Sequence, residues 1–177
     1  MSFRNPKAQH ALVELKAKVD ELQNVRNKLT LWGAKRVGVF HQVDTYYRVP
    51  IGRLKLREAE GKTEVQMIYY EREDIAMPKG SSVFIIDIPQ PKVFKEILNR
   101  IMETKVVVDK IREIYVYEGV QIHLDKVEGL GFFVEFELVT SRDVEKQKGD
   151  LLKLSLLREK LGISPQCLVK GSYSDLI

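Results

Sequence analysis

Charged and apolar side chains alternate without interruption over the segment Arg53-Leu54-Lys55-Leu56-Arg57. Successive side chains of a β-strand point to opposite faces, so this pattern predicts a strand with three cations on one face and two leucines on the other. An ordinary half-buried strand, with its leucines on the core and its charges in water, has the same pattern. A different arrangement is favoured because the pattern recurs in other segments, with both signs of charge.

The recurring charged positions fall into a basic set and an acidic set. The basic set is Lys16, Lys18, Arg53, Lys55, Arg57, Lys110 and Arg112. The acidic set is Glu14, Asp125, Glu135 and Glu137. In each segment the charged residues alternate with apolar ones, which predicts one charged face and one apolar face for several strands.

Turn residues and hydrophobic spacing divide the rest of the chain into strands and helices. Strands are predicted over residues 11–19, 35–49, 53–58, 63–72, 81–88, 106–117, 120–127 and 132–140. Helices are predicted over residues 21–32, from the prolines at 89 and 91 to about 102, and 141–161. Residues 73–80 are predicted to form an exposed loop.

Residues at the helix starts and on the helix faces give more specific expectations. Asp20 and Ser141 are predicted to cap the first and third helices. In the second helix the predicted buried positions are Val93, Phe94, Ile97, Leu98 and Ile101. In the third helix they are Val144, Leu151, Leu154 and Leu161.

Most neighbouring strands are joined by short turns, which is typical of an antiparallel sheet with helices packed outside it, an α+β fold. The three amphipathic helices need an apolar sheet surface. If that surface is the outer face, the charged face lies inside, and about eight strands can close into a barrel around it.

A charged interior constrains the ligand. Many like charges are costly to bury without partners, and lysine and arginine are common phosphate binders. Several carboxylates close together favour a divalent cation such as Mg²⁺ or Mn²⁺, which takes oxygen ligands and bridges to phosphates. A polyphosphate held between cations and a carboxylate-bound metal is the simplest occupant, although each residue alone could equally be solvated or salt-bridged.

Composition limits the alternatives. The chain has 177 residues, enough for one domain, and it has no apolar run of membrane-spanning length. Residues 1–10 lack an apolar signal core, so we expect a cytoplasmic protein. The net charge is +4 without a block of five basic residues, which does not argue for nucleic acid. The single cysteine, Cys167, excludes an internal disulfide.

Several segments, in order, resemble the CYTH domain, also known as the triphosphate tunnel metalloenzymes. They are VELKAKV at 13–19, QVDTYY at 42–47, GRLKLRE at 52–58, KIR at 110–112, and HLD at 123–125 followed by GLG at 129–131, Glu135 and Glu137. The resemblance extends from about residue 12 to 173 and is greatest to members similar to class IV adenylyl cyclases.

The resemblance implies an eight-stranded antiparallel tunnel formed by a single domain over residues 1–177. It implies that Glu14, Asp125, Glu135 and Glu137 hold Mg²⁺ or Mn²⁺ and that all seven basic residues hold a triphosphate. Lys16, Arg57, Lys110 and Arg112 are the implied catalytic residues. The implied substrates are ATP, inorganic triphosphate or thiamine triphosphate, and the reaction is nucleotide cyclisation or hydrolysis.

The sequence departs from the family pattern at two places. Leu12 replaces the first glutamate of the family's Glu-x-Glu-x-Lys motif. Glu71 stands about where many members have a lysine, and we expect Arg72 to substitute for it only if the strand bulges there and turns Arg72 toward the tunnel. A module that binds polyphosphate or nucleotide without turnover is therefore the alternative to an enzyme.

Other features leave further alternatives open. An RNA-binding β-domain is a third reading, disfavoured by the carboxylates on the basic faces. Tyr46, Tyr47, Tyr69 and Tyr70 are candidates for stacking on an organic ring, or for packing. His41 and His123 are both expected to be structural; of the two, His123 is the better candidate for proton transfer because it shares a strand face with Asp125. The oligomeric state, monomer or homodimer, stays open.

Overall fold

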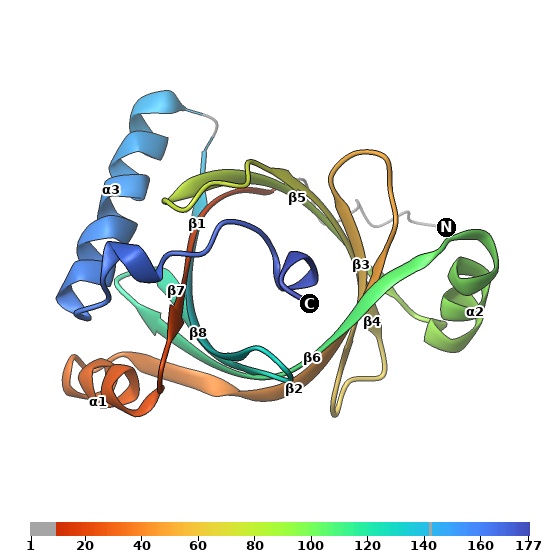
Figure 1. Ribbon diagram of the computed structural model, residues 1–177, viewed down its shortest axis with the longest axis horizontal. Helices are drawn as coiled ribbons and strands as arrows, with labels where there is room; N and C mark the ends of the chain where they lie inside the picture. Colours follow the sequence, from red (N-terminus) through yellow and green to blue (C-terminus); the bar gives the residue numbers. More distant parts are fainter. Residues whose placement is uncertain (1–9, 142) are drawn as a thin grey trace, which may run out of the picture.

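The computed structural model describes residues 10–141 and 143–177 (Figure 1). The strands are β1 (His10–Val19), β2 (Lys35–Tyr47), β3 (Arg53–Ala59), β4 (Val65–Arg72), β5 (Lys79–Ile88), β6 (Thr104–Tyr117), β7 (Val120–Val127) and β8 (Gly131–Thr140). The α-helices are α1 (Gln23–Leu31), α2 (Pro91–Ile101) and α3 (Val144–Lys160). Two short 3₁₀-helices, η1 (Pro165–Cys167) and η2 (Tyr173–Asp175), follow near the C-terminus.

The strands form one closed antiparallel barrel in the order β1-β5-β4-β3-β2-β6-β7-β8. Closure comes from β1, which pairs with β5 on one side and with β8 on the other. Figure 1 shows the strands as a ring with the helices outside it. The predicted α+β fold, an eight-stranded antiparallel barrel with external helices, is confirmed.

The outer face of the barrel is apolar where the helices cover it. One cluster joins α1 and α3 to strands β1, β6, β7 and β8, and includes Leu15, Phe136, Leu29 and Leu154. A second cluster places Leu98 of α2 against Leu56 of β3 and neighbouring strands. Leu56 belongs to the alternating segment, so its outward position turns Lys55 and Arg57 toward the bore.

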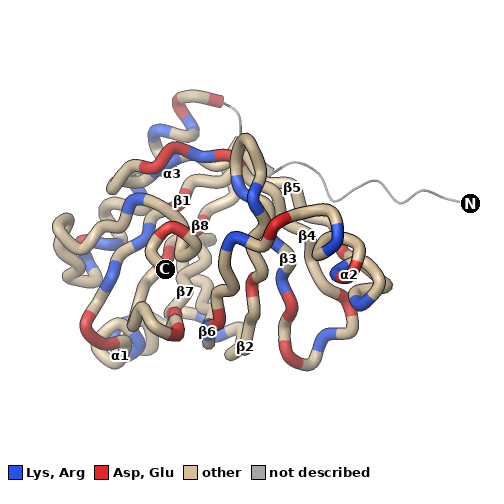
Figure 2. The backbone as a smooth tube through the Cα atoms, turned by 45° about the vertical axis from the view of Figure 1, so that its right-hand side comes forward, with Lys and Arg blue, Asp and Glu red and all other residues tan. Residues whose placement is uncertain are grey.

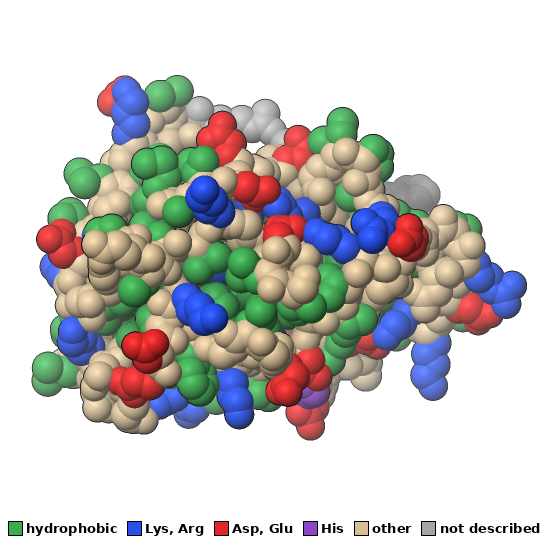
Figure 3. All heavy atoms as spheres, in the orientation of Figure 1, with side chains coloured by type: hydrophobic (Ala, Val, Ile, Leu, Met, Phe, Trp, Pro, Cys, Tyr) green, Lys and Arg blue, Asp and Glu red, His purple; other side chains and the backbone are tan. Residues whose placement is uncertain are grey.

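The C-terminal segment closes one end of the barrel. The Tyr173 ring packs inside this end, edge-to-face with Phe133 at 5.0 Å between ring centroids. Asp175 fixes the segment by ion pairs with Arg53 (2.8 Å) and Lys105 (2.6 Å). In the space-filling view, side chains, many of them hydrophobic, fill the middle of this face (Figure 3). The short tail is therefore part of the barrel's architecture.

The predicted helix caps were wrong at both positions. Residue Leu22 occupies the N-cap of α1, and the Glu21 carboxylate accepts hydrogen bonds from the N–H groups of Gln23 (2.8 Å) and Asn24 (3.1 Å). At α3 the cap is Asp143, which accepts from the N–H of Lys146 at 2.8 Å. In both cases a carboxylate lies closer to the first turn than the residue predicted from sequence, and it satisfies the free N–H groups there.

Two buried surfaces also differ from the predictions. On α2 the row formed by Phe94 and Leu98 faces the barrel. The neighbouring row, Val93, Ile97 and Ile101, is exposed. Within each row the residues are spaced i, i+4, and the two rows lie next to each other on the helix surface. Because a short helix on a convex barrel buries only a narrow stripe, only one of the two rows is covered. On α3 Leu154 and Leu161 are buried as predicted, but Val144 in the first turn is exposed.

The segment predicted as an exposed loop ends earlier than expected. Lys79 already belongs to β5 and is only 3% exposed. Its Nζ donates to the carbonyls of Ile75 (3.0 Å) and Lys170 (3.4 Å), so it ties the preceding loop to the C-terminal segment.

Among the described residues, no helix has the length and apolar character needed to cross a membrane.

Candidate functional site

The bore of the barrel contains a cavity of about 290 Å³ that is lined by side chains from all eight strands and from the C-terminal segment. Figure 2 shows basic and acidic positions interspersed along these strands. The cations in the lining come from β1, β3, β4 and β6 and from the turn between β3 and β4; they are Lys16, Lys55, Arg57, Lys62, Arg72, Lys110 and Arg112. Separate segments of the sequence therefore converge on one charged cavity.

Arg72 faces the cavity, whereas Glu71 points outward. The Glu71 carboxylate accepts a hydrogen bond from the Tyr69 hydroxyl at 2.6 Å on the exposed surface. Inside the barrel, the guanidinium of Arg72 pairs with Glu14 of β1. The β4–β5 register is continuous through Glu71 and Arg72, so Arg72 reaches the cavity without a bulge.

A carboxylate that the sequence analysis did not single out, Asp44 of β2, lies among the basic residues. Its oxygens accept from Arg57 Nε (2.7 Å), Lys55 Nζ (2.9 Å) and Lys110 Nζ (2.8 Å). Burial alone would raise the pKa of Asp44, but the three cations hold it well below its usual value. The alternation of Gln42, Asp44 and Tyr46 on one strand face was the available signal.

The same burial lowers the pKa of two lysines in the bore. The pKa of Lys110 falls to about 7 and that of Lys55 to about 8, mainly because burial disfavours the charged amine and because neighbouring arginines repel it. Asp44 opposes both shifts. The positive charge of these two lysines therefore titrates close to neutral pH.

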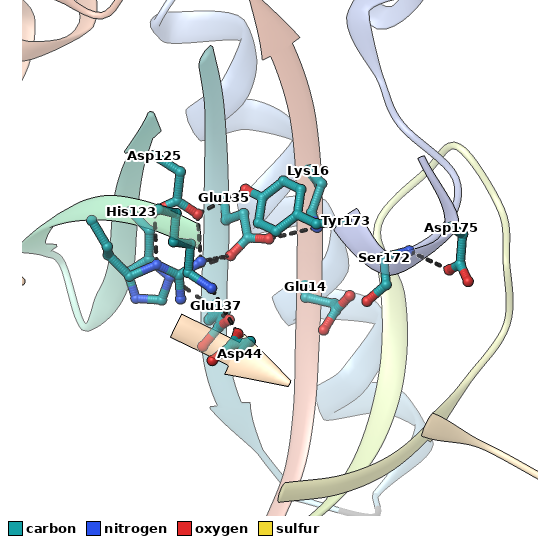
Figure 4. Close-up of polar contacts among 12 residues, drawn as sticks. Glu14, Lys16, Asp44, His123, Asp125, Glu135, Glu137, Ser172, Tyr173 and Asp175 are labelled. Atoms are coloured by element: carbon teal, nitrogen blue, oxygen red, sulfur yellow. Dashed lines mark hydrogen bonds and ion pairs between the residues drawn. The ribbon is translucent and has the colours of Figure 1, made fainter. Parts of the chain in front are cut away.

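The carboxylates expected to bind metal lie in different surroundings (Figure 4). Asp125 is fully buried and accepts from Arg112 Nε (2.8 Å) and from the Tyr173 hydroxyl (2.7 Å). Glu135 pairs with Lys16 at 2.7 Å and also contacts Arg112. Burial acts to raise the pKa of Glu135, yet Lys16 and Arg112 hold it well below its usual value.

One group of side chains in the described residues has the spacing to hold a metal ion. It consists of His123, Glu135 and Glu137, whose donor atoms all lie within 4.8 Å of one another. Two of the four expected ligands, Glu135 and Glu137, are thus together, while Glu14 faces Arg72 and Asp125 faces Arg112. The two carboxylates supply oxygen ligands of the kind that Mg²⁺ and Mn²⁺ take, so this pair fits the metal that the family resemblance implies.

The two remaining basic candidates, Lys18 and Arg53, lie outside the cavity lining. Lys18 is exposed at the closed end, above the Phe133 ring at 5.9 Å. Arg53 binds Asp74 and Asp175, as part of the anchorage of the C-terminal segment. Of the four tyrosines, Tyr46 and Tyr70 line the cavity.

The other two tyrosines lie on the outer face of the barrel, not in its bore. Tyr47 packs against the α2 side of the barrel and its hydroxyl donates to Asn99 at 3.2 Å. Tyr69 contacts Glu71 and lies 6.1 Å from the Phe84 ring, both on the outside.

A closed antiparallel barrel with cations on four strands and a pair of glutamates on β8 agrees with the triphosphate-tunnel fold expected from the sequence. The chain belongs to the CYTH domain family, whose sequence model matches residues 11–173.

The relatives agree with this assignment. A Methanocaldococcus jannaschii protein named "Putative adenylate cyclase" is 28% identical over 178 residues, which is 93% of this chain and 97% of the relative. A Pyrococcus furiosus protein of known structure has a TM-score of 0.82 at 23% identity, covering 94% of this chain and 99% of its own. A Hippeastrum protein whose structure is described as revealing a dominant triphosphatase activity has a TM-score of 0.59 at 14% identity, covering 87% and 88%.

Proposed function

We propose that the protein is a divalent-metal-dependent enzyme that binds a triphosphate in the bore of the barrel and cleaves it, by hydrolysis or by nucleotide cyclisation. The observation that carries the proposal is the convergence of seven cations and the Glu135–Glu137 pair on one cavity in the bore. The names of the archaeal and plant relatives support a reaction of this class.

In this proposal the phosphate chain binds where Asp44 now gathers Lys55, Arg57 and Lys110. Phosphate oxygens accept the same hydrogen bonds as a carboxylate, so these three cations would transfer to the substrate with little rearrangement. Lys18 and Arg53 are left out of the proposed substrate site because neither lines the cavity.

On the other side of the cavity, Lys16 and Arg112 are held in place by Glu135, and Arg112 also by Asp125. Fixed cations of this kind stabilise charge that develops on a phosphoryl group and its leaving oxygen. Bound Mg²⁺ or Mn²⁺ would supply Lewis-acid stabilisation of the same charge. Lys16, Arg57, Lys110 and Arg112 therefore remain the proposed catalytic residues.

The second candidate function is capture of a triphosphate without turnover. It is favoured by Leu12, whose side chain lines the cavity and packs on the apolar cluster inside the barrel. A hydrocarbon at this position supplies no metal ligand. The cavity lining then offers fewer carboxylates for a second cation.

One assay separates the two functions. The protein is incubated with inorganic triphosphate, ATP or thiamine triphosphate and with Mg²⁺ or Mn²⁺, while phosphate, pyrophosphate and cyclic AMP are measured. Product from any substrate, lost in an Arg112→Ala variant, supports the enzyme. Tight binding of the triphosphates without any product would leave the binding module as the function.

A further inference from the structure

The imidazole of His123 on β7 is buried and has one nitrogen without a hydrogen bond. The residue is 3% exposed and lies directly opposite Glu135 in the β7–β8 register. Its Nε2 lies 3.3 Å from Gln121 Oε1. Its Nδ1 is a buried polar atom without a hydrogen bond; it lies 3.6 Å from a Glu135 oxygen and 3.7 Å from a Glu137 oxygen.

The contact with Gln121 favours one placement of the imidazole proton. An amide oxygen only accepts hydrogen bonds, so this contact is a hydrogen bond when the proton is on Nε2. In that tautomer the lone pair is on Nδ1, the nitrogen that lies 3.6 Å from Glu135 and 3.7 Å from Glu137. Fixing the ring through its other nitrogen is the usual way in which proteins orient a histidine that binds a metal.

The distances around Nδ1 suit an ion shared by the three side chains. A separation of 3.6–3.7 Å is too long for a hydrogen bond between the imidazole and either carboxylate. Nitrogen and oxygen atoms that each lie about 2.0–2.2 Å from one metal ion are roughly 3–4 Å apart. The unpaired Nδ1 is thus independent evidence for a ligand at this cluster of acids.

We propose that His123 Nδ1 binds the divalent cation together with Glu135 and Glu137, and that this nitrogen makes the site prefer transition-metal ions such as Co²⁺ and Zn²⁺ over Mg²⁺. Imidazole is a good ligand for these ions, whereas Mg²⁺ selects oxygen. The inference deepens the proposed function by specifying its metal site, but binding of the cation is measured without any substrate.

The first experiment uses the full chain without a substitution at His123. The protein, labelled with ¹⁵N in histidine, is titrated with ZnCl₂ while long-range ¹H–¹⁵N spectra are recorded and calorimetry gives the stoichiometry. The Nδ1 signal of His123 is expected to move in step with occupancy of the site. An unchanged Nδ1 signal at saturation, movement of Nε2 instead, or no zinc binding would overturn the inference.

A matched control removes the surface imidazole that could compete for zinc. His41 lies outside the bore, with its Nε2 2.8 Å from Asp109. In a His41→Gln variant the zinc affinity of the bore and the response of His123 Nδ1 are expected to be unchanged. Loss of all zinc binding in this variant would place the site at His41 and overturn the inference.

The second experiment compares metals in His123→Gln. We expect the affinity for Co²⁺ to fall at least tenfold, the scale on which even outer-sphere changes act, and the affinity for Mg²⁺ to change less than twofold. An unchanged ratio of the two affinities, in a variant with the thermal midpoint of the parent protein, would contradict the assignment. If the variant does not fold, the spectra of the unsubstituted protein decide.

The two proposals can fail separately. Turnover of a triphosphate with Mg²⁺, without any response of His123 Nδ1 to zinc, would leave the enzyme function standing and remove His123 from the metal site. Zinc binding through Nδ1 without turnover of any substrate would keep His123 in the metal site and remove the enzyme function.

Discussion

Lys110 and Asp44 form a buried ion pair at the centre of the barrel. Lys110 Nζ and Asp44 Oδ2 are 2.8 Å apart, and neither side chain is more than 1% exposed. Because Lys55 and Arg57 bind the same carboxylate, Asp44 neutralises part of the basic interior. The barrel therefore has an internal anion at the position proposed for the phosphate chain.

Asp44→Asn is expected to destabilise the protein and to make its stability depend on an added anion. Removing one partner of a buried charge network typically costs about 3–5 kcal/mol. Inorganic triphosphate supplies the missing charge, so it should raise the thermal midpoint more in this variant than in the unsubstituted protein. Asp109→Asn is the matched control, since Asp109 lies on the outer face of the adjoining β6 strand. If triphosphate raised the thermal midpoint of Asp44→Asn and of the unsubstituted protein equally, overlap between Asp44 and the triphosphate site would be excluded.

Arg57→Ala is expected to weaken triphosphate binding by at least tenfold in a variant that still folds, because Asp44 keeps Lys55 and Lys110 as partners. Arg57 lines the cavity and makes two hydrogen bonds to Asp44, and a charge-assisted hydrogen bond contributes about 1.5–3 kcal/mol. Calorimetric titration with inorganic triphosphate measures the effect. Arg36→Ala is the control because its side chain is exposed outside the barrel. Unchanged affinity in Arg57→Ala would remove this residue from the site.

Glu135→Gln is expected to abolish turnover or to raise the metal concentration that turnover requires. The substitution keeps the size of the side chain but removes the charge that contacts Lys16, Arg112 and the candidate metal position. Turnover is measured as a function of Mg²⁺ and Mn²⁺ concentration. Glu145→Gln, at an exposed site on α3, should behave like the parent protein. Identical metal dependence in both variants would contradict a ligand role for Glu135.

The lowered pKa values predict that triphosphate affinity falls as the pH rises from about 7 to 9. Through this range Lys110 (pKa about 7) and Lys55 (pKa about 8) lose their charge in the unliganded protein. Affinity should fall by about tenfold for each charge-assisted hydrogen bond that is lost. Titrations at pH 6.5 and 9 measure it, and Lys110→Arg, which stays charged, should have a flatter profile.

The same two lysines should affect stability in the opposite direction. Their pKa in the unfolded chain is about 10.5, so between pH 7 and 10 the unfolded state binds more protons than the folded state. Their contribution to the free energy of unfolding therefore rises with pH over this range. Affinity and stability that both fall would show that neither lysine has a lowered pKa.

Leu154→Ala is expected to lower the free energy of unfolding by about 2–5 kcal/mol, the range for buried leucines. Leu154 is fully buried between α3 and the outer face of the barrel. Its control is Leu152→Ala on the exposed side of the same helix, where a change within about 0.5 kcal/mol is expected. Chemical denaturation of both variants measures the difference. Equal losses would show that α3 does not depend on this contact.

The sequence by itself determined the strands, the barrel and most of the charged lining. Alternation has a period of two residues, so the face on which Lys55, Arg57 and Glu135 lie follows directly from their positions. The buried stripe of α2 was less predictable, because two neighbouring rows of that helix are equally hydrophobic and only contact with the barrel distinguishes them.

Only the tertiary structure decided how the charges are paired. Asp44, Arg72 and Tyr173 come from β2, β4 and the C-terminal segment, and the fold brings them to Lys110, Glu14 and Asp125, which lie far from them in the sequence. The residue type of an acidic or basic side chain does not indicate whether it faces water or another charge. Its partner and its pKa follow from the distance to side chains far away in the sequence, and strand alternation does not specify that distance.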